Sequence, residues 1–184
     1  MDMRDRIERG LGGFERAVGK LPGYRGYKQK EMAREADAMV RDQINRGIAV
    51  ELDRLAVLQQ KLMSGGGLRY LDDVDAIMRR LQTLGTTVRT ASYGYAGLFD
   101  AVKVKEVELD ALYEHDAALL ESLPSLTAAV AGLEAATGDP QGLEKAIGEL
   151  EKAASELRRQ WDQRREALLR AGVAADVDAP GEQQ

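Results

Sequence analysis

The stretch "LEKAIGELEKAASELRRQW", residues 143–161, decides the fold class of this chain. Its apolar residues are spaced alternately four and three positions apart: Leu143, Ile147, Leu150, Ala154, Leu157 and Trp161. This heptad spacing places them along one side of an α-helix, as in coiled coils. Leu168 extends the series, but Arg164 stands where the next apolar residue is expected. We expect Asp139 to cap this helix, Pro140 to begin it and Gly172 to end it.

Two further amphipathic helices precede this one in the chain. Apolar residues at steps of three and four predict helices over residues 27–63 and 69–91. The turn "SGGG", residues 64–67, makes them a long antiparallel hairpin. Helices over about 105–123 and 125–137 follow, because we expect Pro124 to end or kink the helix that reaches it. The prediction is an all-α, elongated helical bundle, built on this hairpin and completed by a C-terminal coiled-coil-like helix.

The domain organisation follows from these elements. We expect one helical domain over residues 1–172, made of an amphipathic N-terminal helix (3–21), the hairpin (27–91) and acidic C-terminal helices (105–172). Residues 173–184 have the composition of a disordered tail.

The N-terminal helix carries an apolar stripe interrupted by glycines. Its members are Met3, Ile7, Leu11, Phe14, Val18 and Leu21. Each interior glycine costs a helix about 1 kcal/mol relative to alanine, so this helix needs a surface to order it. We expect that surface to be the bundle. The alternative is an anionic membrane, with Ile7, Leu11, Phe14 and Val18 facing lipid.

Two short segments share a glycine–tyrosine pattern in a chain whose aromatic content is only 5%. "PGYRGYK", residues 22–28, carries Tyr24 and Tyr27, and "SYGYAGLFDAV", residues 92–102, carries Tyr93, Tyr95 and Phe99. The hairpin brings both segments towards one end of the bundle. They form either a structural joint or a tyrosine-rich interaction patch, because tyrosine is favoured in interfaces. The sequence leaves open whether residues 92–104 are loop or helix.

Several chemistries are disfavoured by what the chain lacks. It has no cysteine, which excludes disulfides and thiolate metal sites, and its single histidine, His115, does not suffice for a histidine-based zinc or di-iron site. The Gly13–Gly19 spacing is wrong for a phosphate loop, and Leu21 stands where Ser or Thr would bind magnesium. Asp72, Asp73 and Asp75 suit the first turn of a helix better than a metal site. We therefore predict no enzymatic activity, no cofactor and no metal.

Charge is distributed unevenly along the chain. Residues 1–30 carry eight Lys and Arg against four acids, whereas residues 106–151 carry eleven acids and one lysine. The net charge of −5 argues against nucleic acid as a partner. The absence of cysteine and of a signal sequence favours the cytoplasm, including the inner face of its membrane. Arg outnumbers Lys and Ala is abundant, as in bacteria with GC-rich coding.

The order of elements resembles that of the bacterial phage-shock and chloroplast membrane-remodelling family, in which an N-terminal amphipathic helix precedes a long helical hairpin. "PGYRGYKQKEMAREAD" and "YGYAGLFDAVKV" also resemble segments of uncharacterised bacterial helical proteins. Neither resemblance implies site residues. The function that we expect is a non-catalytic scaffold or protein–protein interaction module that binds itself or a helical partner. The alternative is a peripheral protein that binds anionic lipid.

Overall fold

The computed structural model describes residues 24–64, 67–91 and 106–177. Helix α3 spans Tyr24–Ser64, α4 spans Leu71–Thr90, α6 spans Glu106–Ala135 and α7 spans Pro140–Val177. A short 3-10 helix, η1 (Leu68–Tyr70), leads into α4. These ranges contain no strand, so the predicted all-α helical bundle is confirmed for the part of the chain they cover.

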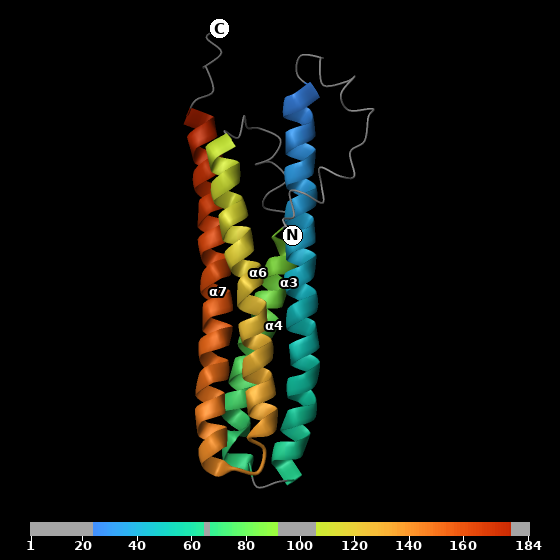
Figure 1. The fold of residues 1–184 in the computed structure, drawn as a ribbon, viewed down its shortest axis with the longest axis vertical. Helices are drawn as coiled ribbons and strands as arrows, with labels where there is room; N and C mark the ends of the chain where they lie inside the picture. The colour runs from blue at the N-terminus through green and yellow to red at the C-terminus, as the bar shows by residue number, and fades with distance from the viewer. Residues whose placement is uncertain (1–23, 65–66, 92–105, 178–184) are drawn as a thin grey trace.

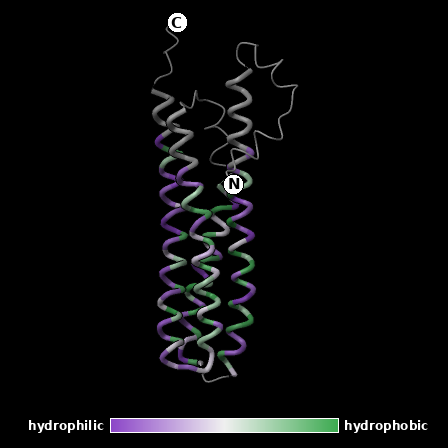
Figure 2. Tube along the Cα trace, viewed as in Figure 1, coloured by the Kyte–Doolittle hydropathy of each residue, from purple (hydrophilic) through white to green (hydrophobic). Residues whose placement is uncertain are grey.

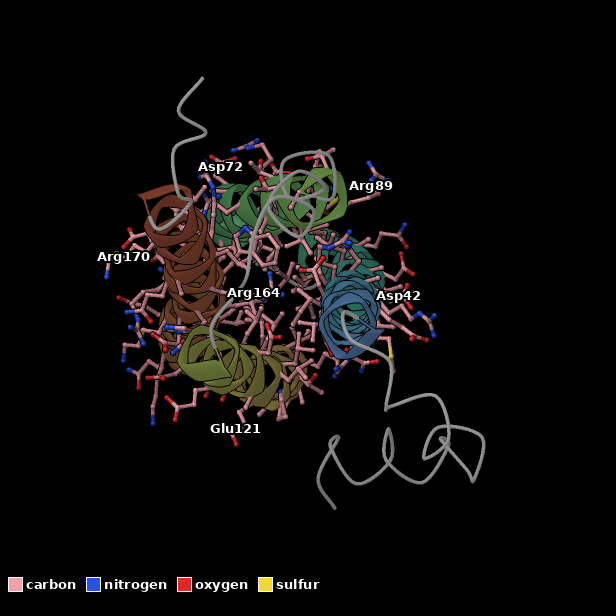
Figure 3. The ribbon with its side chains drawn as sticks, turned by 90° about the horizontal axis from the view of Figure 1, so that it is seen from above. Asp42, Asp72, Arg89, Glu121, Arg164 and Arg170 are labelled. Atoms are coloured by element: carbon pink, nitrogen blue, oxygen red, sulfur yellow. The ribbon has the colours of Figure 1, made fainter. Side chains whose placement is uncertain are left out.

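The helices lie side by side around a common axis (Figure 1). Seen from above, the order around the axis is α3, α4, α7, α6, which makes α3 and α7 diagonal partners (Figure 3). Helices α3 and α6 run in one direction, and α4 and α7 run in the other. Helix α4 is the shortest, and it ends well below the upper ends of the other three (Figure 1).

The core follows the inner sides of all four helices. Apolar and polar residues alternate along each helix, as Figure 2 shows. Leu55 of α3, Val74 of α4, Leu126 of α6 and Leu150 of α7 are all completely buried. Burying one such side chain contributes about 1.5–3 kcal/mol, so the bundle is stabilised chiefly by these contacts. The seven apolar residues predicted to face inward from the last helix are all buried: Leu143, Ile147, Leu150, Ala154, Leu157, Trp161 and Leu168.

The prediction that Pro124 separates two helices is wrong. Helix α6 is continuous from Glu106 to Ala135 with Pro124 in its interior. Proline removes one backbone hydrogen bond and costs a helix about 3 kcal/mol. On either side of it, however, Leu119 and Leu126 are fully buried, and Ser122 Oγ donates to the Leu119 carbonyl at 2.6 Å. Packing of the flanking turns therefore outweighs the local cost.

Two predicted helix ends also need correction. Helix α3 begins at Tyr24, three residues earlier than expected, and α7 continues past Gly172 to Val177. Residues 173–177 are thus helical rather than part of a disordered tail. One glycine costs about 1 kcal/mol, whereas the alanines around Gly172 are the best helix formers. Residues 178–184 lie outside the described ranges.

The lower end of the bundle is fixed by the turn between α6 and α7. Gly138 has a φ of 100°, a conformation that favours glycine. Asp139 Oδ1 then accepts a hydrogen bond from the backbone N–H of Gln141 at 3.1 Å, which confirms the predicted cap. Tyr70 donates its hydroxyl to the carbonyl of Pro140 at 2.7 Å. The start of α4 is thereby joined to the start of α7.

Candidate functional site

Charged side chains meet in the centre of the upper half of the bundle. Arg164 of α7 is completely buried, and Asp37 of α3 and Asp116 of α6 are only 4% and 3% exposed. Arg164 Nη2 donates to Asp37 Oδ1 at 2.7 Å, and its Nε donates to Asp116 Oδ1. Arg41, one turn from Asp37 on α3, donates its Nε to Asp37 Oδ2 at 2.8 Å. We call Asp37, Arg41, Asp116 and Arg164 the Arg164 layer; Figure 3 shows Arg164 in the interior of the bundle, between the helices.

The Arg164 layer is balanced in charge, with two carboxylates and two guanidinium groups. Moving a charge out of water costs several kcal/mol, and an ion pair offsets that cost only with good geometry and further hydrogen bonds. Both oxygens of Asp37 are bonded to a guanidinium. Because Arg164 bonds to two different helices, the layer fixes the positions of α3 and α6 relative to α7.

Trp161 lies one turn before Arg164 and is the only tryptophan of the chain. The guanidinium carbon of Arg164 is 5.5 Å from the centroid of its ring, within range of a cation–π interaction. Two buried donors, Arg164 Nη1 and Trp161 Nε1, have no hydrogen-bond partner among the residues the structure describes. An unpaired buried donor costs about 1–3 kcal/mol, so these two donors offset part of the stability that the ion pairs of the layer contribute.

Burial and the neighbouring charges shift the pKa values of Asp116 and Arg164 in opposite directions. Burial raises the pKa of the Asp116 carboxyl group, and its hydrogen-bonded partner Arg164 only partly reverses that effect. Burial lowers the pKa of Arg164, but the Asp116 and Asp37 carboxylates more than compensate, so that it is raised overall. The Arg164 side chain therefore keeps its positive charge. The buried surroundings of Asp116, in contrast, disfavour the ionised form of its carboxyl group.

A second polar cluster ties α3 to α6 lower in the bundle. Arg54 of α3 bonds to Glu134 of α6 through Nη2 at 2.7 Å and Nε at 3.2 Å. Its Nη1 donates to Glu51, which is 3% exposed, at 2.7 Å. Thr127 Oγ1 of α6 donates to the other oxygen of Glu51 at 2.7 Å. The bond to Arg54 lowers the pKa of Glu134, so this carboxylate remains ionised near neutral pH.

The chemistry of both clusters is that of structural ion pairs. Their carboxylates are bonded to guanidinium or hydroxyl groups. Among the described residues, no group of three histidine or acidic side chains is placed to hold a metal ion. His115, beside Asp116 in sequence, is only partly buried, as expected for a residue at the bundle edge.

A surface groove between α4 and α7 contains three arginine side chains. It is lined by Arg79, Arg80 and Arg158, together with small side chains. Each of these arginines forms an ion pair with an acid, respectively Asp75, Glu151 and Asp162. The pairing neutralises the groove, which therefore does not form an anion site. Asp75 thus belongs to a surface ion pair.

The residues predicted to form interaction surfaces lie largely beyond the structure's described ranges. Tyr93, Tyr95 and Phe99 fall in residues 92–105, and Ile7, Leu11, Phe14 and Val18 fall in residues 1–23. Tyr24 and Tyr27 lie in the first turn of α3, where only the backbone is described. The tyrosine patch and the lipid-facing stripe therefore stay predictions.

The Arg164 layer was only partly visible in the sequence. Arg164 interrupts the apolar heptad of α7, which was the signal that a charge occupies a core position. Asp37 lies seven residues before Ile44 and Asp116 three before Leu119, so both also occupy inward positions. A search for acids in register with an apolar stripe would have flagged both as inward-facing, together with Glu51, but would not have assigned them to Arg164.

None of the helices within the described ranges is both long enough and apolar enough to cross a membrane. No protein-family model, curated protein or solved structure matches this chain.

Proposed function

We propose that this chain is a non-catalytic helical scaffold that associates with copies of itself through the outer face of α3. The observation that supports the proposal is a line of exposed apolar side chains on that face. Met39, Val50 and Val57 are 54%, 57% and 53% exposed. We call these three residues the α3 ridge.

The spacing of the α3 ridge places its three side chains along one line of the helix. At 3.6 residues per turn, the three side chains point within about 20° of one another around the helix, and they extend over roughly 27 Å. They point away from the core, which is lined by Ile44, Ile48 and Leu55 of the same helix. The ridge therefore has no role in packing the bundle on itself.

Charges of both signs accompany the α3 ridge. Arg46, which pairs with Asp42, lies between Met39 and Val50 along the helix, and Asp53 lies between Val50 and Val57 on the same side of the ridge. A helix face with apolar residues between opposite charges can pack on a copy of itself across a twofold axis. A stable interface buries about 1,200–2,000 Å² in total, more than three side chains supply, so we expect weak association that depends on concentration.

The experiment is sedimentation equilibrium over a wide concentration range. Val50→Glu combined with Val57→Glu places two carboxylates on the ridge and should leave a monomer at every concentration. The matched control is Ala49→Glu combined with Ala56→Glu, which adds the same charge at exposed positions of α3 away from the ridge. Equal association of both variants and the wild type would contradict this proposal.

Two finer points of architecture support a scaffold. We infer that α3 and α4 form the antiparallel hairpin on which the bundle is built, and that α7 packs as a coiled-coil-like helix. The heptad burial of α7 and the closeness of Gly85 in α4 to Asn45 and Ile48 in α3 support this inference.

We further propose a cytoplasmic location, in keeping with the cysteine-free composition.

The alternative function, binding of anionic lipid through residues 3–21, rests on the sequence pattern. Co-sedimentation with anionic vesicles at low and high salt tests it. Capture at low salt that disappears when residues 3–21 are deleted would favour it, because basic residues bind anionic lipid through interactions that salt screens.

A further inference from the structure

We propose that two copies of this chain pack face to face and antiparallel through the groove between α6 and α7, so that the occupant of the groove is the same groove of a second copy. Helix α7 lies diagonally opposite α3, so this groove opens on a different side of the bundle from the outer face of α3 (Figure 3). The inference rests on the proposed function, because we expect this contact to join pairs that the α3 ridge has already formed.

The groove follows α6 from Ser125 to Ala136 and α7 from Gly142 to Glu156; we call it the α6–α7 groove. On the α6 side, residues 122–133 contain no charged residue, although charged residues make up 31% of the chain. Ala128 and Gly132 are nevertheless exposed, and a Cβ added at Gly132 would meet no atom within 4 Å. The centres of protein interfaces are depleted of charged residues, so this side of α6 has the composition of a surface that a partner covers.

The α7 side of the groove carries four charged residues of alternating sign: Lys145, Glu149, Lys152 and Glu156. Their steps of four, three and four residues place them within about 60° of one another around the helix. Reversing their order inverts every sign, so the line complements an antiparallel copy of itself.

The register of the second copy follows from this complementarity. With the twofold axis midway between Leu150 and Glu151, Lys145 faces the partner's Glu156. Glu149 then faces the partner's Lys152, and the symmetry repeats both pairs. A parallel arrangement would instead set each charge opposite the same charge of the copy, which is destabilising.

The uncharged side of α6 has its centre at the same level. Asp116 of α6 bonds to Arg164 of α7 and the two helices run in opposite directions, so residue 150 of α7 is about level with residue 130 of α6. The part of α6 that lines the groove, Ser125–Ala136, is centred on that level. About the same axis, Ala128 faces the partner's Gly132, so uncharged surface meets uncharged surface. Two separate features of the sequence therefore agree on one twofold axis.

The bonds that these charges make within the chain do not oppose the contact. Lys152 pairs with Glu149 at 3.0 Å, and both side chains are more than half exposed. An ion pair this exposed contributes little to stability, so both groups are available to a partner. The line of charges extends over only roughly 17 Å, and an interface of this size is smaller than the about 1,200–2,000 Å² of stable complexes. One contact alone is therefore too weak to hold two chains, whereas a pair formed through the α3 ridge offers two such contacts to a second pair.

The test is sedimentation equilibrium of the full chain with the charges of the groove altered. The acidic variant, Lys145→Glu with Lys152→Glu, and the basic variant, Glu149→Lys with Glu156→Lys, each set like charges opposite one another. Each alone should form pairs and nothing larger, whereas the wild type should form larger species at high concentration. A mixture of the two variants restores every oppositely charged pair and should again form the larger species. Recovery in the mixture also shows that both variants are folded.

A variant with all four substitutions is the matched control. It inverts every sign but keeps the line complementary to an antiparallel copy of itself, so it should associate as the wild type does. Loss of the larger species in this variant would show that the charges face some other surface, which overturns a second groove as the occupant. Larger species that persist unchanged in the acidic variant would also overturn the proposal, as would a mixture that forms none.

The same measurements separate this inference from the proposed function. A wild type that stops at pairs, which Val50→Glu with Val57→Glu abolishes, would overturn the inference and leave association through the α3 ridge intact. Pairs that the acidic variant abolishes and the ridge variant retains would support the α6–α7 groove and contradict the ridge. A wild type that is monomeric at every concentration would overturn both.

Discussion

Replacing Arg164 by methionine should destabilise the bundle far more than the same replacement at the surface. The change keeps an unbranched side chain in the core but removes the guanidinium from Asp37 and Asp116, which are 4% and 3% exposed. Breaking a buried ion pair by removing one partner costs about 3–5 kcal/mol, because a buried charge is left uncompensated. Arg41 still pairs with Asp37, so most of the cost arises at Asp116.

The matched control is Arg158→Met on the same helix. Arg158 and its partner Asp162 have side chains that are 44% and 43% exposed, so their ion pair should contribute only about 0–1 kcal/mol. Urea unfolding followed by circular dichroism at 222 nm measures the free energy of unfolding of both variants, and a thermal scan at the same wavelength gives their melting temperatures. For a chain of this length, the Arg164 variant should melt roughly 10 °C below the wild type, taking about 2–4 °C per kcal/mol.

A third variant tests whether the loss of stability comes from leaving a buried charge without its partner. Asp37→Leu, Asp116→Leu and Arg164→Met together remove the three most deeply buried charges of the layer and leave only Arg41, whose side chain is 15% exposed. Similar replacements elsewhere are neutral or stabilise by about 1–4 kcal/mol. This triple variant should recover the stability that Arg164→Met loses. Our account of the Arg164 layer would be refuted by an Arg164→Met variant no less stable than Arg158→Met, or by a triple variant as unstable as the single one.

Three further predictions follow from local geometry. Gly138→Ala should destabilise by about 1 kcal/mol because residue 138 has a φ of 100°, whereas Gly132→Ala, with open space around its Cβ, should stabilise α6 by about 0.5–1 kcal/mol in the same urea assay. Tyr70→Phe should cost about 1 kcal/mol by removing the bond to the Pro140 carbonyl, and thermal melts that match the wild type would contradict this. Because burial raises the pKa of Asp116, its contribution to stability is complete below the ordinary value of 3.8 and is lost as pH rises through the folded-state pKa. The stability of the wild type relative to Asp116→Asn should therefore decrease from pH 4 to pH 8, and a difference that increases with pH would show the opposite shift.

The sequence by itself determined the helical class and most of the core. The heptad from Leu143 to Trp161 predicted which side of α7 is buried, because apolar residues at steps of three and four can share one side only of a helix. Asp139 and Pro140 determined where α7 begins for a similarly local reason, since the cap forms within two residues. Such features depend on neighbours in the chain and can be read without the fold.

Tertiary structure alone decided whether local helix breakers end a helix. Pro124 and Gly172 weaken a helix in any context, but neither ends one here. For Pro124 the reason is that the turns on both sides bury Leu119 and Leu126 against other helices. The burial of these side chains depends on distant parts of the chain. A rule about the local effect of proline cannot predict it.

Tertiary structure also decided the partners of Arg164. The heptad showed an arginine at an inward position, but its acids are 127 and 48 residues away, on α3 and α6. Nothing in the spacing along α7 selects Asp37 and Asp116 from the other acids of the chain. The arrangement of helices around the axis selects them, because it brings Asp37 of α3 and Asp116 of α6 to the level of Arg164 on α7. A buried guanidinium bonds only to carboxylates at its own level, so the pairing depends on the register of the helices rather than on the sequence of any one of them.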